Sequence, residues 1–197
     1  MGHHTSIWQQ RRKRTSAAKA AFELARASAR PVIQISNFSA MGVVIVPLVL
    51  IIAWVLSLLG VTAPGANPGE PFAENAMSWM LSLPVGAMFI VSGFMHTVFA
   101  KKTAANIGWQ TNGFQYEIGF GSFGMGIAGF VAAGTDQTVA WVCVSIAASG
   151  FLLGAAANHF REMIKDKNFA PGNTIINISN IGLPVSLWAL LFATGAV

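Results

Sequence analysis

The stretch MGVVIVPLVLIIAWVLSLL, residues 41–59, carries no charged side chain and decides the class of fold. About 20 apolar residues are enough for a helix to cross the hydrocarbon core of a bilayer. A cleaved signal peptide would have an apolar core of only about 7–15 residues behind a short basic region. Here the apolar core is longer, and 40 residues precede it. The stretch therefore predicts an uncleaved helix that spans a membrane.

Four further apolar segments follow the first, and we expect each of them to be a membrane-spanning helix. Pro84 and Pro184 lie inside the second and the fifth segment, and Pro84 should kink its helix because proline removes a backbone donor. Residues 1–40 are predicted to be a separate basic tail ahead of a membrane domain at 41–197. The fold class is therefore an all-α membrane bundle of five helices, with spans at about residues 41–59, 77–100, 118–134, 138–160 and 175–197.

The composition agrees with a chain that is solvated by lipid. Hydrophobic residues make up 54% of the sequence and charged residues only 10%, whereas soluble domains contain about 25% charged residues. Cys143 is the only cysteine, which excludes an intramolecular disulfide and a cysteine-based metal cluster.

The position of the positive charge indicates lipid rather than nucleic acid as the partner. The formal net charge is +5, but seven of the twelve basic residues lie ahead of the first apolar run. Residues 16–30 are rich in alanine and are expected to form a surface helix on anionic lipid or, alternatively, a solvated tail. The strongest basic run, which we expect to face lipid, is Arg11, Arg12, Lys13 and Arg14.

Cytoplasmic loops of membrane proteins carry an excess of Lys and Arg. With the N-terminus inside, the cytoplasmic segments hold the seven bases of the tail, two at residues 101–102 and three at 161–167, which is every base in the chain. The two outside loops hold none. We therefore predict a multi-pass protein of a bacterial cytoplasmic (inner) membrane with its C-terminus outside.

Glycine is frequent in the predicted third and fourth spans. Residues 124–129 match the pattern G-x-G-x-x-G, but a dinucleotide site requires a strand before this pattern and a helix opening after it. We therefore interpret the glycines as sites of close contact between helices. The predicted packing residues are Gly121, Gly124, Gly126, Gly129, Gly150 and Gly154.

Polar side chains gather near the predicted cytoplasmic boundary, and such groups in membrane segments often mark function. His96 and His159 could ligate haem or a metal, because imidazole is a common ligand. Together with Glu117 they could instead relay protons or bind a quinone head group. The cluster could also bind a polar head group or a partner, or serve only to hydrogen-bond the loops. The candidates are His96, Glu117, His159, Gln115, Asn158, Asn177 and Trp109.

Several short elements lie between residues 92 and 184. They are SGFMH (92–96), AANIGW (104–109), FQYEIG (114–119), Gly124 with Gly126, Gly154, His159 and NFAPGN (168–173). In these elements the chain resembles the DoxX-like family of small membrane proteins, and most of all an uncharacterised bacterial branch with His, IGW and FQxE elements. The resemblance implies a four-helix bundle, here with an additional N-terminal span. It also implies a link to quinone-coupled sulfur oxidation or to assisting other membrane proteins.

The loops are too short to build an obvious catalytic domain, and the glycine-rich faces suit contacts between helices. We therefore expect a non-catalytic accessory or assembly subunit of a larger membrane protein complex, whose partners are lipid and other membrane subunits or itself. The alternative is a redox, quinone-binding or haem-binding membrane protein that uses His96, Glu117 and His159. A third hypothesis is a small-solute transporter.

Overall fold

The computed structural model describes residues 37–197, with side chains from residue 43 onward. All regular secondary structure in this part of the chain is helical. The predicted basic run and the surface helix or solvated tail over residues 16–30 lie outside the described residues.

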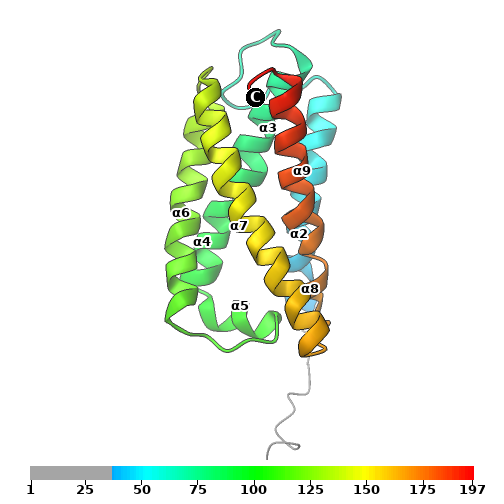
Figure 1. Cartoon of the computed structure of the whole chain (residues 1–197), viewed down its shortest axis with the longest axis vertical. Coiled ribbons are helices and arrows are strands. Elements are labelled where there is room, and N and C mark those ends of the chain that lie inside the picture. Colours follow the sequence, from blue (N-terminus) through cyan, green and yellow to red (C-terminus); the bar gives the residue numbers. More distant parts are fainter. Residues whose placement is uncertain (1–36) are drawn as a thin grey trace, which may run out of the picture. The chain divides into compact units, whose positions relative to one another are not determined.

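The long helices run side by side along one axis (Figure 1). Two short helices, α5 (Ala100–Asn106) and α8 (Pro171–Thr174), lie at one end of this bundle, which we call the α5 end. The C-terminus and the loop of residues 59–71 lie at the opposite end, the C-terminal end. The helices along the axis are α2 (Asn37–Leu58), α3 (Phe72–Met80), the π-helix η1 (Leu81–Ala87), α4 (Met88–Thr97), α6 (Gly113–Ala133), α7 (Thr138–Lys165) and α9 (Asn177–Ala193).

Apolar helices of membrane-spanning length indicate a membrane protein. Three helical segments of the described chain are long and apolar enough to cross a bilayer, namely Phe72–Thr97, Thr138–Lys165 and Pro171–Ala193. Val43–Leu58 is a shorter apolar helix. The structure is therefore compatible with a membrane helical bundle, and the predicted all-α class agrees with it.

Pro84 changes the type of helix in the second predicted span. Proline lacks the N–H of an α-helical hydrogen bond, and its ring crowds the carbonyl four residues earlier. The structure accommodates Pro84 in the π-helix η1, whose turns are wider than those of an α-helix. The sequence predicted a kink at Pro84. The structure shows that the residues around Pro84 form a π-helix. Pro47 and Pro184 lie inside α-helices.

The apolar core lies among the helices near the C-terminal end. The side chains of Met77, Met80, Leu81 and Leu187 are completely buried there. α2 is joined to α9 by a hydrogen bond of 3.0 Å from Trp54 Nε1 to Ser186 Oγ. This core fixes the long helices that carry the polar side chains of the α5 end.

Buried polar side chains hold the two connections at the C-terminal end. The Asn75 side chain accepts from the Ala63 backbone N–H at 2.8 Å and donates to the Val61 carbonyl at 3.0 Å. Trp141 closes the α6–α7 turn by donating its indole N–H to the carbonyl of Ala132 at 2.9 Å. Polar groups that interrupt the apolar pattern at this end therefore pair with loop backbone.

The glycines fall into two groups. A Cβ on Gly126 would stand 2.8 Å from the carbonyl oxygen of Gly86, and one on Gly129 would stand 2.9 Å from the carbonyl oxygen of Leu81. These two glycines allow α6 to lie directly on η1, as expected for small residues between membrane helices. The remaining four predicted packing residues do not take part in such contacts within the described part of the chain, where nothing lies within 4 Å of an added Cβ: Gly121, Gly124, Gly150 and Gly154.

Candidate functional site

Two turn-rich segments meet at the α5 end. The segment that we call the first loop, residues 106–109 (NIGW), begins at the last residue of α5. The second loop, residues 168–173 (NFAPGN), follows α7 and includes the first three residues of α8. Asn168 Nδ2 donates to the carbonyl of Ile107 at 2.8 Å. Gly108 has φ +77°, and a Cβ there would stand 2.9 Å from Asn168 Nδ2. Glycine at this position therefore allows both the backbone turn and the contact between the loops.

Asn173 connects the second loop to α7. Its side chain is completely buried, and its Nδ2 donates to the carbonyl of Asn168 at 2.7 Å. Its Oδ1 lies 2.5 Å from Nδ1 of His159. Because the amide nitrogen is committed to Asn168, the atom that faces His159 is an acceptor. Nδ1 of His159 must therefore be the protonated nitrogen of the ring.

The rings of Trp109 and His159 stack on each other. Their centroids are 5.8 Å apart and their planes differ by 18°. The indole Nε1 of Trp109 is buried and has no hydrogen-bond partner among the described residues. The first loop thus supplies a flat apolar wall for the imidazole, while Asn173 fixes the orientation of that ring.

A row of asparagines at the start of the last predicted span extends this network into the bundle. Asn177 Nδ2 donates to the backbone carbonyl of Asn173 at 3.0 Å, and Asn180 Nδ2 lies 3.5 Å from Asn177 Oδ1. All three asparagines are buried. Each amide nitrogen therefore faces a neighbouring oxygen that would be costly to leave without a hydrogen bond in a bundle core.

The other predicted candidates lie apart from this network. His96 on α4 is half-buried and its Nδ1 has no hydrogen-bond partner among the described residues, while Glu117 is exposed at the start of α6. Across residues 43–197, no hydrogen bond, ion pair or ring contact joins His96 or Glu117 to His159. The side chains suggested for a proton relay are thus not in direct contact there.

Of two further candidates, only Gln115 has a local structural role in the described part of the chain. Gln115 donates from Nε2 to the carbonyl of Ala100 at 2.8 Å, which ties α6 to α5. Asn158 is half-buried beside His159, without a hydrogen bond of its side chain to the described residues.

No group of three or more His, Cys, Asp or Glu side chains in the described part of the chain is arranged to hold a metal ion.

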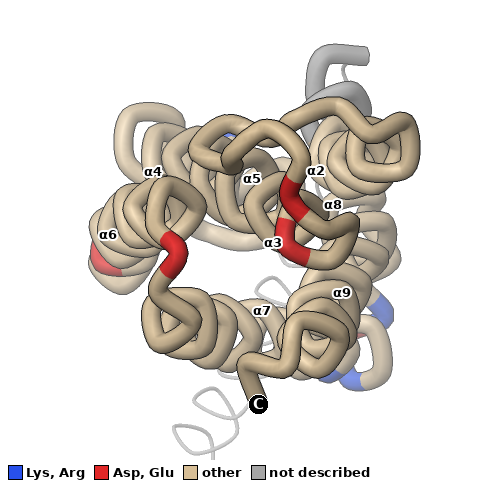
Figure 2. The backbone as a smooth tube through the Cα atoms, turned by 90° about the horizontal axis from the view of Figure 1, so that it is seen from above, with Lys and Arg blue, Asp and Glu red and all other residues tan. Residues whose placement is uncertain are grey.

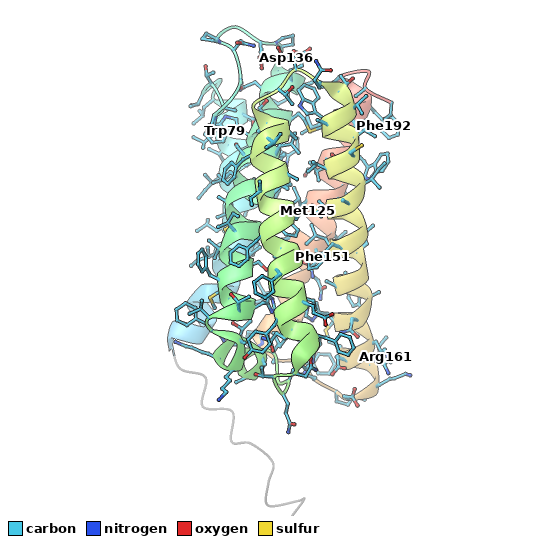
Figure 3. All side chains as sticks on the ribbon, turned by 90° about the vertical axis from the view of Figure 1, so that its left-hand side faces the viewer. Trp79, Met125, Asp136, Phe151, Arg161 and Phe192 are labelled. Atoms are coloured by element: carbon cyan, nitrogen blue, oxygen red, sulfur yellow. The ribbon has the colours of Figure 1, made fainter. Side chains whose placement is uncertain are left out.

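The two ends of the bundle differ in charge. Acidic residues lie around the C-terminal end in the view along the bundle (Figure 2); these are Glu70, Glu74 and Asp136. Asp136 and Arg161 mark the opposite ends in Figure 3. All described bases lie at the α5 end, and they are Lys101, Lys102, Arg161, Lys165 and Lys167, accompanied by Glu117, Glu162 and Asp166.

The contact between Asn168 and Ile107 is the part of the site that sequence reasoning did not foresee. Both loops contain glycine and asparagine, which marks each of them as a turn. Their pairing was not visible, because 61 residues separate the two partners. The signal that could have indicated it is Gly108, whose lack of a side chain leaves room for a neighbour.

Comparison with known proteins identifies one family. A model described as "Family of unknown function (DUF6790)" matches residues 42–196. No curated protein and no solved structure matches the chain.

Proposed function

The chain belongs to the DUF6790 family, and we propose that it is a small, non-catalytic accessory or assembly subunit of a larger membrane protein complex. In this proposal it crosses a bacterial cytoplasmic membrane five times, through α2, the run α3–η1–α4, α6, α7 and the run α8–α9. The N-terminus is cytoplasmic and the C-terminus lies outside. The position of all described bases at the α5 end supports this orientation under the positive-inside rule.

The observation that carries the proposal is an open row of small residues on α7. No atom of residues 43–197 beyond the adjoining helix backbone lies within 4 Å of a Cβ added to Gly150 or Gly154. Residues spaced three or four apart share one face of a helix, and the residues in register with these glycines are also small and exposed. We call this surface the small-residue face of α7; it consists of Cys143, Ala147, Gly150, Gly154 and Ala157.

The opposite side of α7 is already occupied. Trp141, Ala148, Ala156 and His159 are buried on that side. The small-residue face is thus not needed for the fold of the chain itself. In lipid, helices associate through close packing of small residues rather than through the hydrophobic effect. A face of this kind, left open on a long helix, supports a role in binding a membrane helix of another subunit.

Replacing both glycines of this face by leucine should weaken the binding of the partner subunit. We expect the double variant Gly150→Leu/Gly154→Leu to reduce the partner-to-chain ratio about tenfold or more, which corresponds to about 1.4 kcal/mol or more of binding free energy. The reason is that the leucine side chains would hold the partner helix away from the α7 backbone. The ratio is measured by quantitative mass spectrometry of the chain purified in mild detergent at native expression.

The matched control uses the open glycines of α6. Gly121→Leu/Gly124→Leu adds the same bulk at positions that also have nothing within 4 Å of an added Cβ, but these lie off the small-residue face of α7. We expect this variant to keep its partner. A partner that stays stoichiometric in the α7 variant would contradict the proposed role of this face, and the lack of any stoichiometric partner for the native chain would contradict the function itself.

A further inference from the structure

The loop of residues 59–71 borders a cavity between the end of α2 and the start of α3. Its volume is about 280 Å³, close to the lower end of the range of small-molecule sites, which is about 300–1,000 Å³. The polar side chains that line it are Ser57, Thr62, Asn67, Glu70 and Asn75. The cavity belongs to the C-terminal end of the bundle, which faces the outside in the proposed orientation, and it is separate from the small-residue face of α7.

Glu70 contributes a carboxylate oxygen that the loop leaves free. The backbone N–H of Asn67 and its side-chain Nδ2 both donate to Oε1 of Glu70, at 2.6 and 2.9 Å. Oε2 of Glu70 has no hydrogen-bond or ion-pair partner among residues 43–197. The residue is half-buried. One oxygen therefore fixes the position of the carboxylate in the loop, while the other can accept hydrogen bonds from a ligand.

The charges around the cavity favour a cation. α2 ends at Leu58, which lines the cavity, and the carbonyl end of a helix carries a partial negative charge. Glu74 in the first turn of α3 adds a second carboxylate next to Asn75 in the chain. All described bases lie at the α5 end. An anionic ligand would therefore meet like charge here and no base of the described residues.

The free polar atoms of the lining are hydrogen-bond acceptors. Asn67 uses Nδ2 to bind Glu70, so the atom that remains is Oδ1. Neither this oxygen nor the hydroxyl of Thr62 has a hydrogen-bond partner in the part of the chain that the structure describes. Asn75 is already bound to the backbone of residues 61 and 63. Together with Oε2 of Glu70 there are three acceptors, and a primary ammonium group has three N–H donors.

Two other kinds of cation fit less well. A quaternary ammonium group is typically held against the faces of several aromatic rings, and Phe72 is the only aromatic residue of this lining. A calcium ion takes six to eight oxygen ligands, many of them carboxylates. Glu70 is the only carboxylate among the lining residues. The lining thus favours a cation that donates hydrogen bonds.

We propose that this cavity is a binding site for the primary ammonium group of a small aliphatic amine, with Glu70 as its counter-ion. The ammonium N–H groups donate to Oε2 of Glu70, Oδ1 of Asn67 and the hydroxyl of Thr62. Leu58 and Phe72 line the same cavity and are 71% and 50% exposed, so they can contact the aliphatic part. This chemistry has two sources, a free amine such as ethanolamine and the head group of phosphatidylethanolamine.

Two soluble ligands of equal charge test the site on the full chain in detergent. Ethanolamine has a primary ammonium group, whereas the ammonium group of choline has no N–H donor. We expect ethanolamine to bind about tenfold more tightly or better, because hydrogen bonds to a charged group are the strong ones. The dissociation constants are measured by isothermal titration calorimetry in a buffer and a detergent that contain no primary amine.

A second arm distinguishes the two sources of the amine. Nanodiscs with equal amounts of phosphatidylethanolamine and phosphatidylcholine present the same two ammonium groups on lipids, and native mass spectrometry reports which lipid the chain retains. A preference for ethanolamine without a preference between the lipids assigns the site to a free amine. A preference for phosphatidylethanolamine without one between the soluble ligands assigns it to a lipid. The absence of a preference in both arms would overturn the proposal without need of any variant.

Two variants test the role of the carboxylate. Glu70→Gln removes the charge but keeps an oxygen that can accept from Asn67. We expect it to weaken the binding of the preferred amine about tenfold or more, because the charge-assisted hydrogen bond is lost. Its melting temperature is measured to show that the loop end of the bundle is still folded.

Glu74→Gln is the matched control, since it removes the same charge four residues later at a position that does not line the cavity. We expect it to change the affinity by no more than about twofold, because charges that act through water are screened. Equal losses in the two variants, or full binding by Glu70→Gln, would overturn the assignment of Glu70 as the counter-ion.

Discussion

Replacing Gly126 by leucine is expected to lower the free energy of unfolding by about 3 kcal/mol, the upper end of the usual cost of overpacking. The atom nearest to an added Cβ is the carbonyl oxygen of Gly86 at 2.8 Å, and the side chain of Ile90 lies at the same distance. A side chain can change its rotamer, but the backbone of η1 can move only together with the core residues that surround it. The variant is examined by thermal unfolding of the purified chain in detergent.

Gly124 provides a control on the same helix, two residues away. Nothing lies within 4 Å of a Cβ added there, so Gly124→Leu adds the same side chain on an open face. We expect its melting temperature to stay close to that of the native chain. If the two variants unfold at the same temperature, the direct contact of α6 with η1 is wrong.

Replacing Asn173 by leucine is expected to cost about 2–6 kcal/mol, because two buried groups lose their partners at about 1–3 kcal/mol each. The groups are Nδ1 of His159 and the carbonyl of Asn168, which lie 2.5 and 2.7 Å from the Asn173 side chain. Leucine has the same branching and the same number of side-chain heavy atoms as asparagine, so the substitution leaves no cavity. The free energy of unfolding in detergent, measured by denaturant titration, gives the cost.

The neighbouring asparagine tests whether the effect is specific. Asn158 is half-buried and precedes His159, but its side chain makes no hydrogen bond to the described residues. We expect Asn158→Leu to change the free energy of unfolding by less than about 0.5 kcal/mol, as surface substitutions usually do. A loss equal to that of Asn173→Leu would show that any change in this part of the bundle is costly and that the proposed network is not the cause.

Apolar runs were sufficient to predict where the long helices lie, but not how they begin. The helix of the second predicted span, α3, starts at Phe72, whereas the apolar pattern predicted a start near residue 77. Glu74 and Asn75 interrupt the apolar run, and hydropathy cannot show that Asn75 is buried against the backbone of residues 61 and 63. The widened turns at Pro84 were missed for a related reason, since a single sequence does not show how a proline inside a helix is accommodated.

The candidate site was predicted only as a level along the bundle axis. The order of spans places His96, Glu117 and His159 near one boundary, yet it does not say which of them face each other. In the structure, His159 stacks on Trp109 and is hydrogen-bonded to Asn173, whereas Glu117 is exposed. The same gap affects the glycines, because composition alone cannot tell the packed Gly126 from the open Gly124. The redox alternative and the resemblance to DoxX-like proteins stay predictions.

The most direct test of the proposed accessory role is photo-crosslinking from the small-residue face of α7 in native membranes. A photoreactive phenylalanine derivative replaces Ala147 on this face, and a second chain carries it at Leu48 on α2, which is 47% exposed. Adducts are identified by mass spectrometry. We predict one defined protein adduct, to another subunit or to a second copy of the chain, from position 147 and lipid adducts from position 48. Lipid adducts alone from both positions would contradict the account.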